Sequence, residues 1–416
     1  MRDRCSLRMI ALLAHANFRR VWLVGVISAS LRWLELLAIA VYVLEQTGSP
    51  SMVALITVLR LAPMFLCGSL IGVIGDRHDR KRILLLGLLS LVLMSAILGA
   101  LALTEAISLW QIALGTFLSG LFIAADMALR RIVTADIAGS DRLSQAMALE
   151  AVSNNATRMI GPVLGGLLLE TLGLPGVYLA GALLYLAAVI LLLRTTYRSA
   201  PVEGEAPAFL GALREGWRYV RGRRVIVAIM AGTVAVNFWG IAYVAMVPVV
   251  GEQVLGLSAF PNGVLMSMLG LGALAGAVLM SRASSSRTFT RIFLLSIVVV
   301  VLGVLGFSLS NSLPLSLTMN LICGVSIGTF SVMQSSIMIL AARPEVRSRV
   351  MGLLTVSIGA GQFGGMLHLG WLADWLGAAV AVQISAIEGL AAMALMAVIW
   401  PELRRPTDLA PPPTER

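Results

Sequence analysis

The chain has 416 residues, of which 58% are hydrophobic and 12% are charged, and its formal net charge is +10. A water-soluble protein of this length needs far more polar surface to cover its core, so the composition excludes that class and predicts a polytopic membrane protein. The positive charge alone would also fit a nucleic-acid-binding protein, but the placement of the basic residues argues against that class.

Apolar stretches long enough to cross a bilayer as helices follow one another along the whole chain. A hydrocarbon core of roughly 30 Å requires about 20 apolar residues in a helix. The expected spans are 21–44, 52–75, 83–103, 108–129, 143–169, 175–193, 225–250, 262–281, 292–310, 314–340, 350–372 and 378–400. These twelve spans predict two six-helix bundles, 1–193 and 225–400, with a cytoplasmic linker at 194–224 and a cytoplasmic tail at 401–416.

The basic residues predict the topology. Of the 31 Lys and Arg residues, 28 lie in the termini or in the connections after spans 2, 4, 6, 8 and 10, and the intervening connections contain none. Because positive residues stay on the cytoplasmic side, both termini are expected to be cytoplasmic in a bacterial-type inner membrane. This distribution explains the net charge without a nucleic-acid partner. The first apolar run has no small-residue cleavage site, so no cleavable signal peptide is expected.

Metal and cofactor chemistry is not indicated. The three cysteines and three histidines are scattered, without a CxxC pair or a ligand cluster, and no GxxxxGK[ST] loop for a nucleotide is present. We therefore expect no metal and no cofactor. No nucleophile, base and orienting group occur together at readable spacing, which argues against an enzyme.

The two halves carry a weak internal repeat. The segment AGSDRLSQAMAL (138–149) precedes span 5, and ARPEVRSRVMGL (342–353) precedes span 11 at an offset of 204 residues. Asp141 matches Glu345, and Met147 matches Met351. Two parallel six-helix halves with a site at their interface near the bilayer midplane are a known transporter plan.

The connection after span 2 reads GVIGDRHDRKR, residues 72–82. It resembles the loop signature of the major facilitator superfamily, although Asp79 stands where that signature usually has a second glycine. The matching residues are Gly72, Asp76, Arg77, Arg80 and Lys81. The resemblance implies a gate in which Asp76 pairs with cations across the interface between the halves. The alternative is an ordinary positively charged anchor on the cytoplasmic side.

Span 5 contains TRMIGPVLGGLLLE, residues 157–170. Its Gly161, Pro162, Gly165 and Gly166 resemble the antiporter motif of the same superfamily, which is associated with exporters, although Thr157 stands at the place of a further glycine. Small residues at four-residue spacing allow close helix approach, and a proline bends the helix. The alternative interpretation is a helix-packing seam without a transport role.

Other segments, such as NFRRVWLVGVIS (17–28) and RVMGLLTVSIGAGQFGGML (349–367), resemble the enterobactin exporter and drug–proton antiporter branch of the superfamily. The resemblance covers nearly the whole chain. It implies a fold of twelve transmembrane helices, export of a siderophore or a drug, and proton antiport. Relatives in this branch often have Gly-Asp near the position of Leu31-Arg32-Trp33, so their charged site on span 1 does not transfer directly.

Ionisable residues inside spans are the first candidates for a functional site, because a charge costs at least about 2.5 kcal/mol at the centre of a bilayer. In the first half, the candidates for substrate binding or proton coupling are Arg32, Glu35, Arg60, Asn154 and Arg158. Arg32 and Glu35 are three residues apart and are expected to interact, either as part of a cavity wall or as a self-neutralising pair. Arg60 is expected near the cavity or at the interface of the halves.

Two further acidic groups lie close to the cytoplasmic ends of their spans. Asp126 is one turn from Arg130, which favours a gate pair over a cargo contact. Glu150 shares a helix face with Asn154 and Arg158, but it could instead close the cytoplasmic end of the bundle with Arg130 or a neighbouring arginine.

The spans of the second half contain no Lys or Arg. Their candidates for cargo contact are polar or aromatic, principally Asn237 and Tyr243, and each alone is more typical of a helix-packing residue. His368 and Glu388 are the groups there that could titrate near neutral pH. Glu388 is ranked below Glu35 as a coupling group because the last span of this fold can face lipid.

The sequence thus predicts a secondary transporter that exports an amphiphilic small molecule by alternating access. In the expected cycle, Glu35 is deprotonated when cargo binds from the cytoplasm and is protonated from outside when cargo leaves. The expected partners are the substrate, protons and membrane lipid, and no oligomer is required. The alternatives are an importer of an anionic metabolite or a lipid flippase on the same fold, and, more remotely, a membrane sensor or assembly factor.

Overall fold

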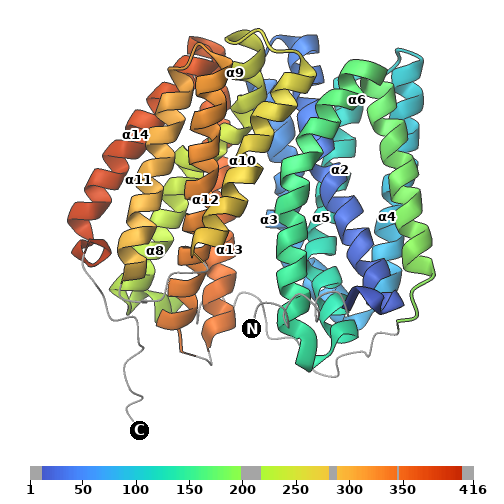
Figure 1. Cartoon of the computed structure of the whole chain (residues 1–416), viewed down its shortest axis with the longest axis horizontal. Helices are drawn as coiled ribbons and strands as arrows, with labels where there is room; N and C mark the ends of the chain where they lie inside the picture. Colours follow the sequence, from blue (N-terminus) through green and yellow to red (C-terminus); the bar gives the residue numbers. More distant parts are fainter. Residues whose placement is uncertain (1–11, 198–216, 281–287, 344–345, 405–416) are drawn as a thin grey trace. The chain divides into compact units, whose positions relative to one another are not determined.

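In the computed structural model, the described residues are 12–197, 217–280, 288–343 and 346–404, and they form helices without any strand (Figure 1). Side chains at 64–77, 128, 140, 144 and 348 lie outside the described residues. An all-helical chain is expected in a bilayer, because a helix satisfies its backbone hydrogen bonds internally where no water can do so. The predicted all-α membrane fold is confirmed.

The first half of the chain forms six membrane-crossing segments in five continuous helical stretches. Their bounds are α2 (Ala16–Thr47), α3 (Pro50–Arg77), α4 (Arg80–Leu103), α5 (Leu109–Ala138), the short 3₁₀ turn η1 (Ser140–Arg142) and α6 (Leu143–Leu193). The long α6 is two helices that meet at Gly173, whose φ of 65° lies in the left-handed region favoured by glycine. The break coincides with the predicted turn between spans 5 and 6.

The second half begins with an irregular crossing and continues with regular helices. The elements are α8 (Arg224–Ala235), the π-helix η2 (Val236–Ile241), the 3₁₀-helix η3 (Ala242–Met246), α9 (Val247–Gln253), α10 (Ala259–Met280), α11 (Phe289–Ser308), α12 (Leu313–Ala341), α13 (Arg347–Leu376), α14 (Ala378–Ile399) and η6 (Pro401–Leu403). A π-helix inside a span is uncommon and is frequently found at functional sites.

Among the described residues, ten helical stretches are long and apolar enough to cross a membrane. One of them is the interrupted α6, which supplies two crossings, and α3 provides a further 28-residue helix. The twelve predicted spans are therefore all present as helices. Most helix ends extend a few residues beyond the predicted apolar runs, because a helix continues past the hydrocarbon core to its capping residue.

The chain divides into two compact units. Unit 1 comprises Met1–Gln46, Ile56–Ala206 and Ser258–Ser267, and unit 2 comprises Thr47–Leu55, Pro207–Leu257 and Met268–Arg416. Each unit thus includes the first residues of a helix that continues into the other unit, namely α3 or α10. The predicted domains did not include this exchange, because apolar pattern alone does not show which neighbours the start of a helix contacts.

Glycines let helices approach closely within unit 1. A methyl group added at Gly161 would lie 2.6 Å from Cβ of Trp33, and one at Gly165 would lie 3.0 Å from Cα of Leu34. A methyl group at Gly166 would overlap the backbone of Ala259 at the start of α10. The antiporter-like motif therefore packs α6 against α2 on one side and against the start of α10 on the other.

The internal repeat extends into this packing. At the same offset of 204 residues, Gly161 corresponds to Gly365 and Gly166 to Gly370. A methyl group at Gly365 would overlap the backbone of Phe238, and one at Gly370 would lie 2.6 Å from Cβ of Ala54, all within unit 2. The close helix packing at these glycines is therefore present in both units. We call it the glycine seam, formed by Gly161, Gly165 and Gly166 in unit 1 and by Gly365 and Gly370 in unit 2.

Candidate functional site

Unit 1 contains a cavity of about 320 Å³ between α2, α5 and α6. The polar residues that line it include Trp22, Arg32, Asp126, Arg130, Glu150 and Asn154. Apolar surface is contributed by Val26, Phe122 and Met147, among others. A concave site with a few convergent polar groups on an otherwise apolar wall is the usual form of a small-molecule site.

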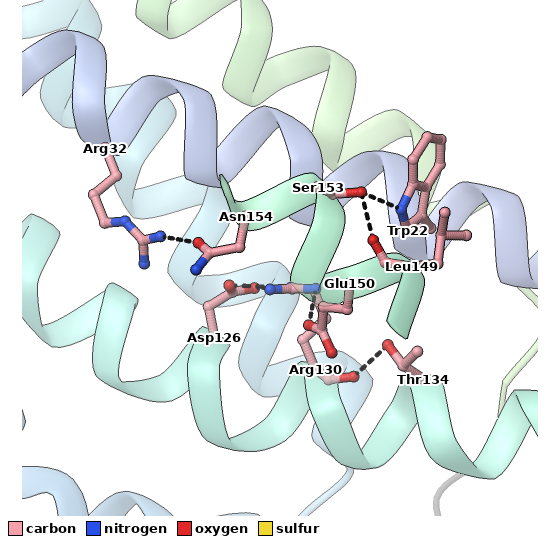
Figure 2. Close-up of polar contacts among 9 residues, drawn as sticks. All are labelled: Trp22, Arg32, Asp126, Arg130, Thr134, Leu149, Glu150, Ser153 and Asn154. Carbon is pink, nitrogen blue, oxygen red and sulfur yellow. Dashed lines mark hydrogen bonds and ion pairs between the residues drawn. The ribbon is translucent and has the colours of Figure 1, made fainter. Parts of the chain in front are cut away.

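Arg130 is the centre of a charged network in this cavity (Figure 2). Its Nε donates to both carboxylate oxygens of Asp126, at 2.9 and 3.0 Å, and its Nη1 donates to Glu150 Oε1 at 2.7 Å. Asp126 and Arg130 lie one turn apart on α5, which brings them to the same face. Glu150 reaches the guanidinium from α6, so the network joins two helices.

The guanidinium of Arg130 lies directly against the backbone of α2. A methyl group at Gly25 would overlap it, and the two carboxylates prevent the side chain from moving aside without loss of its ion pairs. Gly25 thus allows α2 to close over the charged network. The predicted proximity of Asp126 and Arg130 is present, and Glu150 takes the arginine partner that the sequence left open.

Two further hydrogen bonds join α2 to α6 along the same cavity (Figure 2). Arg32 Nη2 donates to Asn154 Oδ1 at 2.7 Å, and Trp22 Nε1 donates to Ser153 Oγ at 2.9 Å. Arg32 also retains an unused donor: its Nε is buried and has no hydrogen-bond partner among the described residues.

Glu35 does not pair with Arg32, contrary to the expectation from their spacing. It is 2% exposed, its Oε2 lies 3.3 Å from Arg60 Nη2, and its Oε1 accepts a hydrogen bond from the Tyr185 hydroxyl at 3.1 Å. Arg60 is 6% exposed and its guanidinium lies against Glu35 within unit 1. The buried carboxylate therefore has its ionic partner on α3 and a hydrogen-bond donor on α6.

Trp33 lies beside two guanidinium groups. The ring centroid is 5.8 Å from Cζ of Arg32 and 5.1 Å from Cζ of Arg158, distances typical of cation–π contacts. Its indole Nε1 is buried without a hydrogen-bond partner in the described part of the chain. The guanidinium groups of Arg32 and Arg158 thus lie around one indole ring. The N–H of this indole remains available to a hydrogen-bond acceptor of a ligand.

The charged residues that line the cavity do not balance. Three guanidinium groups (Arg32, Arg130, Arg131) accompany two carboxylates (Asp126, Glu150), a formal excess of one positive charge. Arg60 and Arg130 are paired with carboxylates, whereas Arg32 bonds to a neutral amide. An acidic group on a ligand is therefore the natural complement of this cavity.

Asn237 and Tyr243 lie in unit 2 and not around this cavity. The amide of Asn237 donates to Thr233 O at 2.8 Å and accepts from Gln362 Nε2 at 3.0 Å, while the hydroxyl of Tyr243 donates to Asn320 Oδ1 at 2.9 Å. Both side chains are buried. Their contacts are typical of helix-packing residues, the alternative to cargo contact that the sequence left open.

The motif at 72–82, which runs from the end of α3 to the start of α4, is described only in part. Gly72, Asp76 and Arg77 have side chains outside the described residues. Lys81 Nζ donates to Thr195 O at 2.6 Å, and Arg80 Nη1 lies 3.4 Å from Asp136 Oδ2, so both hold the end of unit 1 together. Asp79 accepts a hydrogen bond from Lys81 N and caps α4, which explains an acid at the place of the usual glycine.

Sequence reasoning missed several participants. Tyr185 was not considered because a neutral tyrosine carries no charge signal, and His368, Glu388 and Trp239 were not recognised as one cluster. A signal existed: spans joined by a tight turn run antiparallel, so residues at nearly equal distances from that turn lie at similar depth. Gly377 lies 9 residues after His368 and 11 before Glu388, and Gly139 lies 13 residues after Asp126 and 11 before Glu150.

The chain matches the family model described as transmembrane secretion effector over residues 8–410. It is 27% identical to the enterobactin exporter EntS of Escherichia coli O1:K1 / APEC over 408 residues, covering 96% of this chain and 95% of the relative. It is 23% identical to the staphyloferrin A transporter of Staphylococcus aureus, covering 72% and 74%. It is 21% identical to macrolide efflux protein A of Streptococcus pyogenes, covering 81% and 84%.

Solved structures agree on the fold. A bacterial homologue of the human lysosomal transporter Spinster superposes with a TM-score of 0.71 at 15% identity, covering 99% of both chains. A POT family transporter gives a TM-score of 0.74 at 14% identity, covering 93% of this chain and 96% of that one. The chain is therefore a multi-pass membrane transporter and not an enzyme, and it belongs to the transmembrane secretion effector family of the major facilitator superfamily.

Proposed function

We propose that this transporter exports an amphiphilic small molecule with an acidic group, of the siderophore or drug class, in exchange for protons. The observation that carries the proposal is the cavity of unit 1, with its formal excess of positive charge on a partly apolar wall. The cycle is alternating access in a bacterial inner membrane, with both termini cytoplasmic. The names of the relatives support export of siderophores or macrolides.

The cargo contacts in this proposal are Arg32, Trp33 and Arg158. An acidic oxygen of the cargo accepts from Arg32 Nε, a buried donor on the cavity wall without a partner in the described structure, and from Trp33 Nε1, a second such donor on the next residue of α2. An aromatic or apolar part of the cargo lies against the exposed apolar lining of the cavity. Satisfying buried donors is worth about 1–3 kcal/mol each, because an unmade hydrogen bond of a buried group retains its desolvation cost.

Proton coupling in this proposal runs through Glu35. When Glu35 is ionised, it holds Arg60 and therefore ties α2 to α3 inside unit 1. When it takes up a proton from outside, it loses its ionic attraction to Arg60, which alters this tie and favours the state that releases cargo. The glycine seam of α6 packs on α2 at Trp33 and Leu34, next to Glu35. Protonation of Glu35 therefore changes the packing of α2 on α6.

The first test compares the small molecules inside and outside cells with and without this gene, by mass spectrometry. An exported cargo accumulates inside the deletion strain and is restored to the medium by the wild-type gene. Identical profiles in the two strains would contradict export. A compound that disappears from the medium only when the gene is present would instead favour import of an anionic metabolite, which the positively charged cavity also fits.

The second test uses the cargo found in this way, in proteoliposomes with an imposed pH gradient. Glu35→Gln is expected to abolish gradient-driven accumulation while exchange without a gradient continues. Tyr185→Phe removes only one hydrogen bond to Glu35 and serves as the milder variant. Unchanged gradient-driven transport by Glu35→Gln would exclude Glu35 as the coupling group.

A further inference from the structure

A second carboxylate lies within the membrane-spanning part of the chain, in unit 2. Glu388 on α14 accepts from Trp239 Nε1 of η2 at 3.1 Å, and its Oε2 also lies 2.9 Å from His368 Nε2 of α13. We call these three residues the His–Glu cluster. Both contacts converge on Oε2, and the side chains of His368 and Glu388 are 25% and 41% exposed. The pair is therefore not sealed inside the packed helices of unit 2.

Close backbone packing and a π-helix surround the His–Glu cluster. Trp239 lies on the π-helix, where the regular pattern of α-helical hydrogen bonds is interrupted. A methyl group at Gly389 would lie 2.8 Å from Cβ of Trp239, and one at Gly364 would lie 3.1 Å from the ring of Phe238. Phe238 in turn packs on the His368 ring, with centroids 5.3 Å apart. Three elements thus approach closely, and a small shift of α13 changes the cluster.

The His–Glu cluster is the counterpart of Glu35 and Tyr185 in unit 1. Trp239 is 204 residues after Glu35, the offset of the internal repeat, and Glu388 is 203 residues after Tyr185. In each unit, one carboxylate joins the first span to the last through a hydrogen bond from an aromatic side chain. The donor and acceptor have exchanged helices between the two units.

The ionic partners of the two carboxylates differ in chemistry. Glu35 pairs with a guanidinium, which keeps its charge at every physiological pH. Glu388 pairs with an imidazole, and histidine is the side chain that ordinarily gains and loses a proton between pH 5 and 8. The Glu35 pair is neutral whenever Glu35 is ionised, whereas the Glu388 pair changes from −1 to 0 when it binds one proton.

Other ionisable groups on the elements that pack against α14 lie near helix ends or have partners of their own. Arg224 pairs with Glu402, and Arg291 donates to Arg404 O. Tyr243 donates to Asn320, and Asp374 accepts from Ser51 N. The remaining groups, at the start of α13 and at the end of α9, are Arg347, Arg349 and Glu252. By sequence, no Lys or Arg lies within the spans of this half to compensate Glu388.

From this arrangement we infer that His368 and Glu388 form a second proton-binding site of the transport cycle. The inference rests on the proposed proton-coupled export. One proton is held between Nε2 and Oε2 in the neutral state of the pair, and its departure leaves one negative charge inside unit 2. Because the cluster connects η2, α13 and α14, loss of this proton weakens the link between these elements and couples protonation to their packing.

The direct test does not require knowledge of the cargo. The chain has only three histidines, His15, His78 and His368, so protein labelled with ¹³C and ¹⁵N in histidine gives three sets of imidazole signals. The His368→Gln variant assigns the His368 signal, because that signal is absent from its spectrum. We expect the His368 signal to move with pH between 5 and 8, and to titrate with a different midpoint in Glu388→Gln. A His368 signal that stays constant over this range in the wild-type protein overturns the inference.

The functional test uses export from the complemented deletion strain, measured by mass spectrometry at pH 5.5, 6.5 and 7.5. Glu388→Gln and His368→Gln are each expected to remove most of the pH dependence of export, whereas Glu402→Gln, an acid near the end of unit 2, retains it. Size-exclusion profiles verify that the variants fold. A wild-type pH profile in both cluster variants contradicts the inference. If the wild-type gene exports nothing, the proposed function fails, but the histidine titration still decides whether the site binds a proton.

Discussion

The two units share a scaffold and differ in their interior charges. In both, glycines at equivalent positions of α6 and α13 bring that helix into contact with the first span of the unit, at Trp33 and Leu34 in unit 1 and at Phe238 in unit 2. Unit 1 places three guanidinium groups and three carboxylates within its predicted spans, whereas the predicted spans of unit 2 contain Glu388 and His368. The packing seam is thus a property of the repeated fold, and the charges mark where the units specialise.

This comparison separates the residues that the fold requires from the residues that we assign to transport. A glycine that recurs at the offset of 204 residues is needed for close helix approach, and its loss should impair either unit in a similar way. A buried charge without a counterpart in the other unit is not required by the fold. Such a charge costs free energy in the membrane, which is why we assign it to transport.

The largest effect is expected from Arg130→Ala. This change leaves Asp126 and Glu150 buried without their shared partner, and removal of one partner of a buried ion pair costs about 3–5 kcal/mol. We expect a marked fall in the apparent melting temperature of the purified protein. The neighbouring Arg131→Ala is the control, because Arg131 is exposed. Equal melting temperatures of the two variants would show that the charged network does not stabilise unit 1.

A double-mutant cycle on Glu35 and Arg60 tests whether this pair is structural as well as functional. Each single change to Gln leaves one buried group without its ionic partner, and we expect a loss of roughly 3 kcal/mol. The double variant should recover much of that loss. Glu388→Gln should cost less than 1 kcal/mol, because that side chain is 41% exposed. Comparable costs for Glu35→Gln and Glu388→Gln would remove the proposed difference between the units.

The glycine seam offers a matched pair across the units. Gly165→Ala places a methyl group 3.0 Å from Cα of Leu34, and Gly365→Ala places one 2.8 Å from Cα of Phe238. Because backbone atoms cannot move aside, we expect each variant to lose about 1–3 kcal/mol of stability. Gly352→Ala is the control: no heavy atom lies within 4 Å of the added methyl group, so the helix should gain about 1 kcal/mol. A stable Gly365→Ala would show that the seam matters only in unit 1.

Apolar length and the placement of basic residues predicted the helices well, because a bilayer requires long apolar helices with defined flanks. The same reasoning could not predict side-chain partners. Arg32 and Glu35 are three residues apart and therefore lie on neighbouring faces of the helix, yet each bonds to a partner on another helix. Glu35 bonds to groups 25 and 150 residues away. Such contacts depend on helix rotation, which hydropathy does not specify.

Within the candidate site, the local pair was predictable and the distant ones were not. Asp126 and Arg130 are one turn apart on the same helix, so their contact follows from helix geometry. The contribution of Glu150 was one of several arginine pairings that the sequence allowed. Gly25, which carries no charge, could not be recognised as the residue that lets Arg130 lie against α2.

The smallest effect is expected at two equivalent carboxylates that cap helices. Glu170 accepts from Ser258 Oγ at 3.2 Å and Phe260 N at 2.8 Å, at the start of α10 in unit 1. Asp374, 204 residues later, accepts from Ser49 Oγ and Ser51 N, both at 3.1 Å, at the start of α3 in unit 2. A carboxylate at a helix N-terminus contributes about 0.3–1 kcal/mol when it is exposed, as both of these are.

Glu170→Gln and Asp374→Asn should therefore each lower the melting temperature slightly, and the double variant by the sum of the two losses, because the caps lie in different units. Hydrogen exchange at the first turns of α10 and α3 is the more sensitive measurement, and each variant should accelerate exchange only in the helix that it caps. The exposed Glu105, which caps neither helix, provides the control as Glu105→Gln. Faster exchange at both helix starts in a single variant would mean that the two caps are coupled across the units.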